Sequence, residues 1–215
     1  MTLKTLALNI SYFRQGRKLL GRIKNLKNHT HYMPNRIYLI SGTISSGKDT
    51  LLRKLRGYLD FYLIRSTTTR APRTGEKDGE SYQFVDKNEF IELALQNEFI
   101  EFSEKYGDYY GITRNEIQRA LSSKKDIFVK VDEKGVRRLK RVFPQAVSIF
   151  IAPPSLGELR HRINMRGDAD QGLIFKRLMA AHNQIQGLTK SRFDHIIVNS
   201  NINNAIQEIL NRVLV

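Results

Sequence analysis

The sequence predicts an α/β fold in which helices cover both faces of a parallel sheet. Short apolar segments that suit strands alternate with longer segments of helical periodicity, and this order is typical of a parallel sheet. Val147–Ile151 is nearly all apolar, as expected for a strand buried on both faces. A glycine-containing segment between the first strand and the first helix is the third observation.

That segment reads Gly42-Thr43-Ile44-Ser45-Ser46-Gly47-Lys48-Asp49-Thr50. Gly42, Gly47 and Lys48 have the spacing of a P-loop, which turns backbone N–H groups toward phosphates. The helix that follows adds unpaired N–H groups and a positive dipole end, and Lys48 adds a mobile positive charge. The sequence therefore predicts a site for a nucleoside triphosphate.

Composition limits the remaining possibilities. The chain has 215 residues, 40% of them hydrophobic, which suits one α/β domain with inserted subdomains and a packed core. The absence of cysteine excludes disulfides and cysteine zinc sites and fits a reducing compartment, so we expect a cytoplasmic protein. No apolar run approaches the roughly 18 residues of a membrane span. The net charge of +15 suits either phosphate chemistry or a nucleic-acid surface. We expect no nucleic-acid partner, because no nucleic-acid-binding motif occurs.

Residues 1–35 are predicted to be a basic N-terminal extension. They contain seven basic residues and no acid. An organelle transit peptide has this composition, and so does a basic surface helix. A third interpretation is a mis-assigned extension, because Met33 stands just before the first core strand and suits a start of the chain.

Periodicity and breakers predict the elements of the first half in order. Pro72 and Gly75 interrupt regular structure, and Asp86 with Glu89 forms a capping signal. The predicted elements are a buried strand over 36–41, a helix over 47–59, a strand over 62–65, a loop over 66–76, a strand over 83–85, a helix over 87–96, a strand over 99–102, a tyrosine-rich turn over 107–111 and a helix over 113–123.

The second half continues the alternation. The predicted elements are a strand over 127–131, a helix over 133–142, a strand over 147–151, a helix over 155–165, a long helix over about 171–190, a strand over 195–198 and a helix over 202–213. We expect Leu156, Leu159 and Ile163 to form the inner face of the 155–165 helix.

From about Arg36 to the end, the chain resembles the guanylate kinases, a family of nucleoside monophosphate kinases. The resemblance rests on the P-loop and on several spaced words in order: Ser66-x-Thr68-Thr69-Arg70-x-Pro72-Arg73-x-Gly75-Glu76, Gly79-x-x-Tyr82-x-Phe84-Val85, Glu98-Phe99-Ile100-Glu101, Tyr109-Tyr110-Gly111, Asp132-x-x-Gly135-Val136, Phe150-Ile151-x-Pro153-Pro154-Ser155, Arg166-Gly167 and Val198-Asn199. It implies a three-layer P-loop NTPase fold with a parallel core sheet, a small mixed NMP-binding subdomain and a helical lid. The corresponding ranges are core 36–65, 125–156 and 188–215, NMP-binding 66–124 and lid 157–187, within one domain over 36–215.

The resemblance also implies transfer of the γ-phosphate of ATP to GMP, with Mg²⁺ accompanying ATP, by a monomer or homodimer. Two arginines and two phenols suit a phosphate dianion, and a carboxylate suits the N–H donors of a guanine edge. The implied GMP-binding residues are Ser66, Arg70, Arg73, Tyr82, Glu101, Tyr110 and Asp132. The implied ATP-binding residues are Gly42, Ser45, Ser46, Gly47, Lys48, Asp49, Thr50 and Asn199. The implied catalytic residues are Lys48 and the lid arginines Arg162, Arg166 and Arg177.

Three positions depart from the family pattern. Asp49 replaces the hydroxyl that binds Mg²⁺, so the metal ligand is predicted to be Asp49 or Thr50. Lys130 replaces an acid, and Ile112 replaces a hydroxyl that reads guanine. The P-loop end and the 127–131 strand meet beside the metal in this fold, so we expect Asp49 to pair with Lys130 or to take over the metal. Two alternatives stay open: a catalytically weak binding module, or a kinase for another phosphorylated acceptor such as ribose 1,5-bisphosphate.

Overall fold

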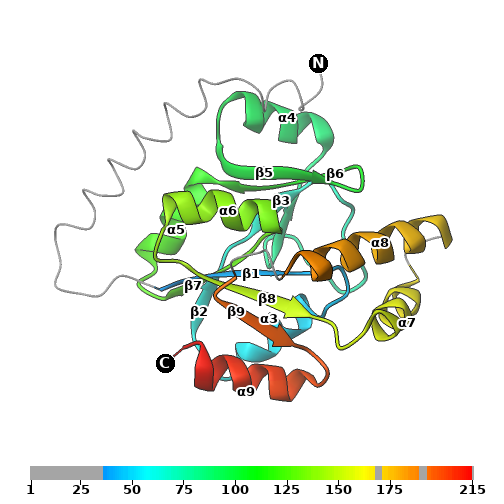
Figure 1. Cartoon of the computed structure of the whole chain (residues 1–215). Helices are drawn as coiled ribbons and strands as arrows, with labels where there is room; N and C mark the ends of the chain where they lie inside the picture. Colours follow the sequence, from blue (N-terminus) through cyan, green and yellow to red (C-terminus); the bar gives the residue numbers. More distant parts are fainter. Residues whose placement is uncertain (1–35, 168–170, 189–192, 215) are drawn as a thin grey trace. The chain divides into compact units, whose positions relative to one another are not determined.

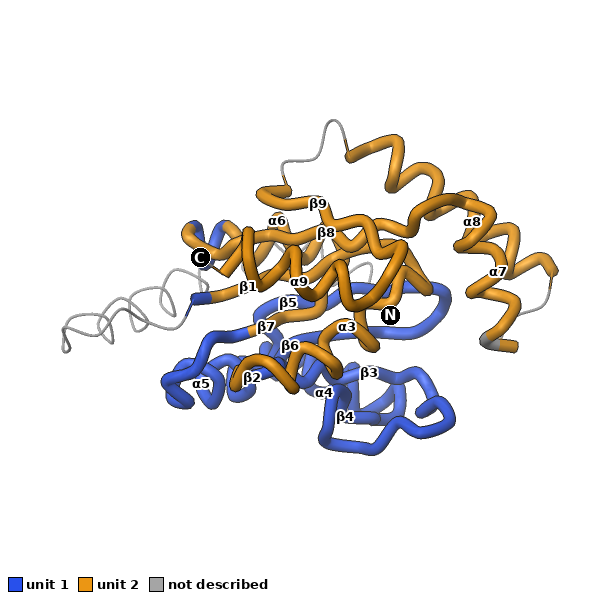
Figure 2. The backbone as a smooth tube through the Cα atoms, turned by 90° about the horizontal axis from the view of Figure 1, so that it is seen from below, with its two compact units in different colours: residues 1–36, 62–127, 141–144 blue, residues 37–61, 128–140, 145–215 orange. Residues whose placement is uncertain are grey.

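The structure is a computed structural model, and it describes residues 36–167, 171–188 and 193–214 (Figure 1). The predicted extension over 1–35 lies outside these residues. The chain divides into two compact units, drawn in blue and orange in Figure 2. Among described residues, one unit contains 36, 62–127 and 141–144, and the other contains 37–61, 128–140 and most of 145–215.

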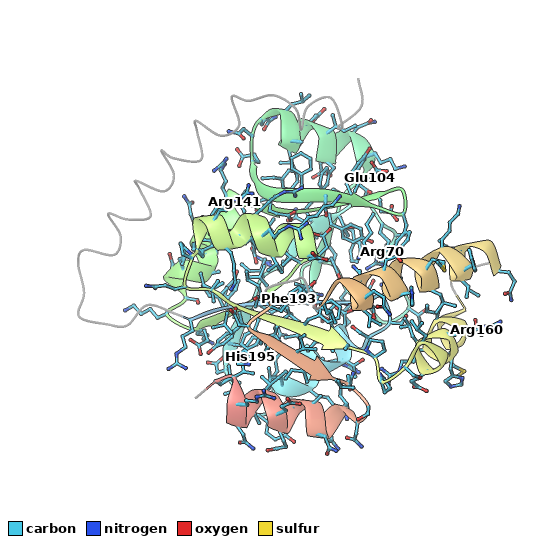
Figure 3. All side chains as sticks on the ribbon, in the orientation of Figure 1. Arg70, Glu104, Arg141, Arg160, Phe193 and His195 are labelled. Carbon is cyan, nitrogen blue, oxygen red and sulfur yellow. The ribbon has the colours of Figure 1, made fainter. Side chains whose placement is uncertain are left out.

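A five-stranded sheet forms the core and has the order β2-β7-β1-β8-β9. Its strands are β1 (Ile37–Gly42), β2 (Phe61–Leu63), β7 (Asp126–Lys130), β8 (Val147–Ala152) and β9 (His195–Val198). β8 pairs in parallel with both β1 and β9, and residues such as Ile40 and Ile149 are fully buried. Phe193, labelled in Figure 3, lies just before β9. Its ring packs on Phe150 of β8 with centroids 5.2 Å apart. The predicted α/β class with a parallel sheet is confirmed.

The helices of the second unit agree with the predicted ones to within a few residues. They are α3 (Lys48–Leu55), α6 (Glu133–Val142), α7 (Leu156–Arg166), α8 (Gln171–Gly187) and α9 (Ile202–Arg212). Leu159 and Ile163 of α7 pack on Ile174 and Ala181 of α8. Leu156 was predicted to lie on the same inner face, and this was wrong, since the residue is 39% exposed. Leu156 is the first residue of α7, about one turn before the residues that contact α8.

The first unit contains a mixed four-stranded sheet of order β4-β3-β6-β5, with one helix between β4 and β5 in sequence and another after β6. Its elements are β3 (Ser66–Thr68), β4 (Tyr82–Phe84), α4 (Lys87–Leu95), β5 (Phe99–Lys105), β6 (Asp108–Thr113) and α5 (Arg114–Ser122). As predicted, Asp86 caps α4 by accepting a hydrogen bond from the Glu89 N–H. Phe90 of α4 then stacks on Phe99 of β5, with ring centroids 4.4 Å apart.

Two segments that were predicted to be irregular contain strands. Residues 66–68 form β3, because three consecutive β-branched or hydroxyl residues pair with strands on both sides. The predicted turn over 107–111 lies mostly within β6. The turn itself consists of Tyr106 and Gly107, whose φ angles of 55° and 86° are those that a two-residue hairpin turn requires.

Candidate active site

The glycines of the P-loop are required by their surroundings. Gly42 has φ 149°, and a Cβ there would lie 2.3 Å from the carbonyl oxygen of Ile151 on β8. Gly47 has φ 91°, and a Cβ there would lie 2.4 Å from Nδ2 of Asn199. Any side chain would therefore push the loop off the sheet, so the loop keeps its shape only with glycine at both positions.

Lys48 is held inside this loop. Its Nζ donates to the carbonyl oxygens of Thr43 at 2.7 Å and Gly42 at 3.0 Å, and it lies 3.4 Å from Oγ of Ser46. Ser45, between these residues, has the left-handed φ of 53° that the curvature of the loop demands. The ammonium is thus positioned by the same loop whose N–H groups suit phosphate.

Asn199 ties the P-loop to the end of β9. Its side-chain Nδ2 donates to the Ser46 carbonyl at 2.8 Å, while the main-chain carbonyl of Asn199 accepts from Nη2 of Arg162 at 3.1 Å. Arg162 also donates from Nε to Glu158, one turn earlier on α7, at 2.8 Å. A predicted lid arginine and a predicted ATP-binding asparagine therefore lie together beside the P-loop. The adenine contact of Asn199 stays a prediction.

The α7–α8 pair also contacts the P-loop through an apolar residue. Ile44 packs against the cluster that Leu159, Ile163, Ile174 and Ala181 form. Arg177 lies on α8 and is buried, with 7% of its surface exposed. The side chain of Arg166, the remaining predicted lid arginine, lies outside the described part of the chain.

Asp49 pairs with Lys130, as predicted from the sequence. The Lys130 Nζ donates to Oδ1 of Asp49 at 2.8 Å; the lysine side chain is 6% exposed and the aspartate 61%. The neighbouring Thr50 is exposed. Within the described residues, no three His, Cys, Asp or Glu side chains are grouped to hold a metal ion. One oxygen of the Asp49 carboxylate is thus bound by an ammonium, and the metal role of Asp49 or Thr50 stays a prediction.

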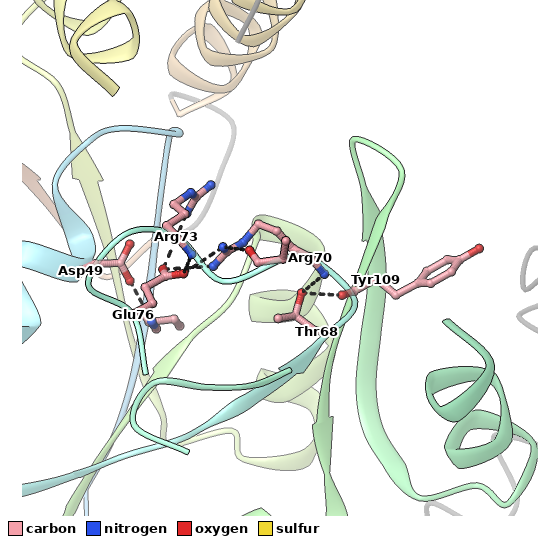
Figure 4. Close-up of polar contacts among 8 residues, drawn as sticks. Asp49, Thr68, Arg70, Arg73, Glu76 and Tyr109 are labelled. Carbon is pink, nitrogen blue, oxygen red and sulfur yellow. Dashed lines mark hydrogen bonds and ion pairs between the residues drawn. The ribbon is translucent and has the colours of Figure 1, made fainter. Parts of the chain in front are cut away.

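In the first unit, two threonines fix the chain at the end of β3. Thr68 Oγ1 donates to the Tyr109 carbonyl of β6 at 2.9 Å, and the Tyr109 N–H donates to Thr69 Oγ1 at 3.0 Å. The Arg70 N–H in turn donates to Thr68 Oγ1 at 3.3 Å, as Figure 4 shows. The two threonines of the Thr-Thr-Arg motif therefore fix the position of the main chain at Arg70.

Arg70 and Arg73 converge on the carboxylate of Glu76 (Figure 4). Arg70 donates from Nη1 to Oε2 at 2.9 Å and from Nη2 to Oε1 at 3.1 Å, and the Arg73 N–H donates to Oε2 at 2.8 Å. Burial by itself raises the pKa of Glu76, but the hydrogen bonds and charges of both arginines hold that pKa below its usual value. The sequence did not predict a role for Glu76, although Glu76 is the last residue of the motif that contains Arg70 and Arg73.

Aromatic rings frame Arg70. Its Cζ lies 5.2 Å from the ring centroid of Tyr82 and 5.5 Å from that of Phe84, both on β4. Burial raises the pKa of the Tyr110 phenol, while the Arg70 charge opposes this rise. The phenol therefore keeps its proton at neutral pH and can donate to an anion. The predicted residues Arg70, Arg73, Tyr82 and Tyr110 belong to one unit, and together they suit a phosphate group.

Glu101 and Ile112 are cross-strand partners on β5 and β6. The register shifts between Phe99 and Glu101, so an extra residue lies in β5 there. As a result Phe99 and Phe102 both pack on Phe90, while Glu101 points to the opposite face from Phe102. Glu101 is 6% exposed and Ile112 is 1% exposed. The predicted base reader is thus a buried carboxylate next to an apolar side chain.

The two remaining predicted GMP contacts are Ser66 and Asp132. Ser66 is buried on β3, just after Arg65, which forms a salt bridge with the buried Glu116 at 2.8 Å. Asp132 accepts a hydrogen bond from the Gly135 N–H at 2.7 Å and so caps the start of α6. Their contacts with guanine stay predictions.

The sequence model of the guanylate kinase family matches residues 34–214. The chain belongs to the guanylate kinase family. The guanylate kinase of Trichormus variabilis is 40% identical over 175 residues, which cover 81% of this chain and 87% of the relative. That of Thiobacillus denitrificans is 37% identical over 178 residues, covering 82% and 84%. The crystal structure of guanylate kinase from Anaplasma phagocytophilum superposes with a TM-score of 0.66 at 32% identity, covering 83% of this chain and 84% of the other.

Three residues of this chain, Asp49, Lys130 and Ile112, differ from the pattern of the family to which it belongs. A guanylate kinase pattern predicts a hydroxyl at 49, an acid at 130 and a hydroxyl at 112. The structure shows that the first two changes are linked by an ion pair, whereas Ile112 is a separate change beside Glu101.

Proposed function

We propose that this protein is an ATP-dependent guanylate kinase, transferring the γ-phosphoryl group of ATP to GMP and releasing ADP and GDP. The observation that carries the proposal is the arrangement of Arg70 and Arg73 on Glu76, with Tyr82 and Tyr110 beside them. A guanidinium group that is already oriented, as that of Arg70 is, binds a phosphate dianion at a smaller entropic cost than a free one.

The P-loop would bind the phosphates of ATP. Its N–H groups and the start of α3 suit the anion, and Lys48, which the loop holds by the Thr43 carbonyl, would neutralise the transferring group. An oxygen of the GMP phosphate forms the new bond to the γ-phosphorus as the bond to the ADP oxygen breaks. The chain contributes positioning and charge stabilisation, and no covalent enzyme intermediate is needed. Arg162, Arg166 and Arg177 would supply further positive charge and exclude water.

Mg²⁺ would enter with ATP, held mainly by phosphate oxygens, where it neutralises charge on the phosphates. Asp49, at the position of the usual metal-binding hydroxyl, and Thr50, next to it in sequence, are the residues that would hold the metal. Because the Asp49 carboxylate is already bound by Lys130, we assign it no step in the transfer.

The second candidate is a catalytically weak binding module, which the Asp49–Lys130 pair favours. A coupled assay of ADP release tests both, with GMP, dGMP, AMP, UMP, CMP and ribose 1,5-bisphosphate as acceptors. We expect turnover with GMP and dGMP well above the others, and loss of turnover in Arg70→Ala but not in Arg119→Ala, an exposed arginine of α5. Absence of turnover with GMP, together with measurable GMP binding, would establish the binding module. Turnover with ribose 1,5-bisphosphate alone would establish the other acceptor.

We propose a cytoplasmic location, or an organelle if residues 1–35 direct import, and a monomer or homodimer. The cysteine-free composition supports a reducing compartment. In the part of the chain that the structure describes, every helix is too short or too polar to cross a membrane.

A further inference from the structure

Lys130 places a buried positive charge at the P-loop helix. It is the last residue of β7, its side chain is 6% exposed, and its Nζ lies 2.8 Å from the Asp49 carboxylate. Asp49 is in the first turn of α3 and directly follows Lys48. The ammonium is therefore fixed within a few ångströms of the helix end where the phosphates of a nucleotide are expected.

The exchange of residues changes the charge at this position. Lys48, Asp49 and Lys130 together carry one positive charge. The pattern of the family, a lysine, a hydroxyl and an acid, carries none. A polyphosphate that arrives without a metal therefore finds more compensating charge in this chain than in the usual site. Unlike a metal ion, this charge cannot be removed by a chelator.

The same pair makes Asp49 a poor metal ligand. One of its oxygens already accepts a hydrogen bond from the ammonium. A Mg²⁺ ion on that carboxylate, at its usual distance of about 2.1 Å, would bring two cations to one anion. Their repulsion disfavours the metal at Asp49, whereas phosphate oxygens near Lys130 would be attracted.

We propose that Lys130 is a further nucleotide-binding residue, which takes over part of the charge neutralisation that Mg²⁺ ordinarily provides, and that Asp49 positions it. The inference rests on the proposed function only in that the P-loop binds a nucleotide. Its consequence is that this protein binds ADP or ATP nearly as well without a divalent metal as with one.

The experiment measures the Kd of ADP by isothermal titration calorimetry, in Mg²⁺ and in EDTA, on the full chain. We expect the two values for the unmodified protein to differ by less than about threefold, and Lys130→Met to weaken metal-free binding by about tenfold, as loss of a charge at this range predicts. Asp49→Ser with Lys130→Glu should make binding depend on Mg²⁺ by tenfold or more, since it restores the family pattern. Lys134→Met, which removes an exposed lysine of α6, is the matched control and should change neither value.

Two results would overturn the proposal. One is an unmodified protein that loses as much affinity in EDTA as the double variant does. The other is a folded Lys130→Met protein with unchanged metal-free affinity, folding being checked by thermal unfolding without nucleotide. If Lys130→Met does not fold, Lys130→Arg and Lys130→Gln give the same comparison between a charged and a neutral side chain. The proposed kinase activity is measured separately, so ADP binding that is independent of metal, without turnover of GMP, would reject the function and keep this inference.

Discussion

The carboxylate of Glu76 holds the guanidinium of Arg70 by two hydrogen bonds, of 2.9 and 3.1 Å, and fixes the backbone of Arg73 by a third. One acid thus orients both arginines of the predicted phosphate clamp. The Arg70 side chain would otherwise lose its freedom when a phosphate binds. Glu76 is a positioning residue in this interpretation, because it acts on the ligand through Arg70 and Arg73.

Replacing Glu76 tests this relationship. In Glu76→Gln the carboxylate loses its charge and one of its acceptor oxygens becomes an amide, so Arg70 is held less firmly. We expect the KM for GMP to rise by about three- to tenfold, equivalent to the roughly 1 kcal/mol of one ordinary hydrogen bond, while kcat changes less. Steady-state kinetics with varied GMP measures the two separately. Glu80→Gln, an exposed glutamate of the same segment, is the control. An equal loss in kcat with unchanged KM would contradict a positioning role.

The sequence predicted that Arg70 and Arg73 bind phosphate, but it did not predict that Glu76 binds both of them. Arg70 and Arg73 were identifiable because their segment resembles the guanylate kinase motif whose arginines bind the GMP phosphate, and guanidinium groups suit a phosphate. The role of Glu76 depends on a turn that brings its carboxylate back to residues three and six positions earlier, and no periodicity indicates such a turn. The pairing of Asp49 with Lys130 was predictable, because two charge changes at neighbouring positions of one fold compensate each other.

The face of the sheet that Glu101 occupies could not be predicted either. Alternation along a regular strand would place Glu101 on the same face as Phe99. The register shift after Phe99 reverses this, so that Phe99 and Phe102 share a face and Glu101 lies on the other. The extra residue is Ile100, between Phe99 and Glu101, and one more apolar residue beside Phe99 leaves no mark in the hydrophobic pattern.

Asp194 provides a prediction about stability and pH. Its Oδ2 accepts hydrogen bonds from Lys140 Nζ at 2.6 Å and from the N–H and Oγ of Ser148, a buried residue of β8, at 2.7 and 2.8 Å. Burial by itself raises the pKa of Asp194, but these hydrogen bonds and the lysine charge hold that pKa below its usual value. Asp194→Asn should therefore lower the free energy of unfolding at pH 7 by about 1 kcal/mol, a value that allows for the partial exposure of the pair.

The pH dependence follows from the direction of this shift. Because the folded pKa is depressed, the stabilisation is complete above the unfolded pKa of about 3.9 and is lost as the pH falls through the folded value. The gap between the unmodified protein and Asp194→Asn should thus narrow as the pH is lowered from 5 toward 3. Urea unfolding over this range measures it, with Glu92→Gln, an exposed acid of α4, as control. A gap that stays constant would show that the asparagine disturbs packing instead.

The Asp49–Lys130 pair predicts an effect on stability as well as on binding. Lys130→Glu alone would place two carboxylates side by side, one of them in a buried position, and should lower the free energy of unfolding. Adding Asp49→Ser removes the repulsion, so the double variant should recover about 1 kcal/mol of the loss. Urea unfolding of the two single variants and the double variant closes the cycle. Strictly additive changes would mean that the two side chains do not interact in solution.

Glu101 is predicted to determine the choice of base. Glu101→Gln replaces one acceptor oxygen by a donor, so one N–H of guanine would meet an N–H and lose its partner. A lost hydrogen bond that leaves a polar group unpaired costs about 1–3 kcal/mol, and the preference for GMP over AMP should fall accordingly. The measurement is kcat/KM for both acceptors. If the variant keeps the affinity and preference of the unmodified protein, Glu101 does not read the base. Glu98→Gln, three residues earlier, is the matched control.

Ile112 allows the opposite experiment, a gain of recognition. It lies directly across from Glu101, on the same face of the sheet, where the family pattern has a hydroxyl residue. Ile112→Thr supplies that hydroxyl next to the carboxylate, and we expect the KM for GMP to fall by several-fold, in line with one added hydrogen bond of about 1 kcal/mol. Some stability should be lost, because Ile112 is 1% exposed and threonine is smaller and more polar. Ile112→Val has the shape of threonine without the hydroxyl, so it should share part of the loss in stability and none of the gain in affinity. If threonine and valine change the KM equally, the space at position 112 matters and the hydrogen bond does not.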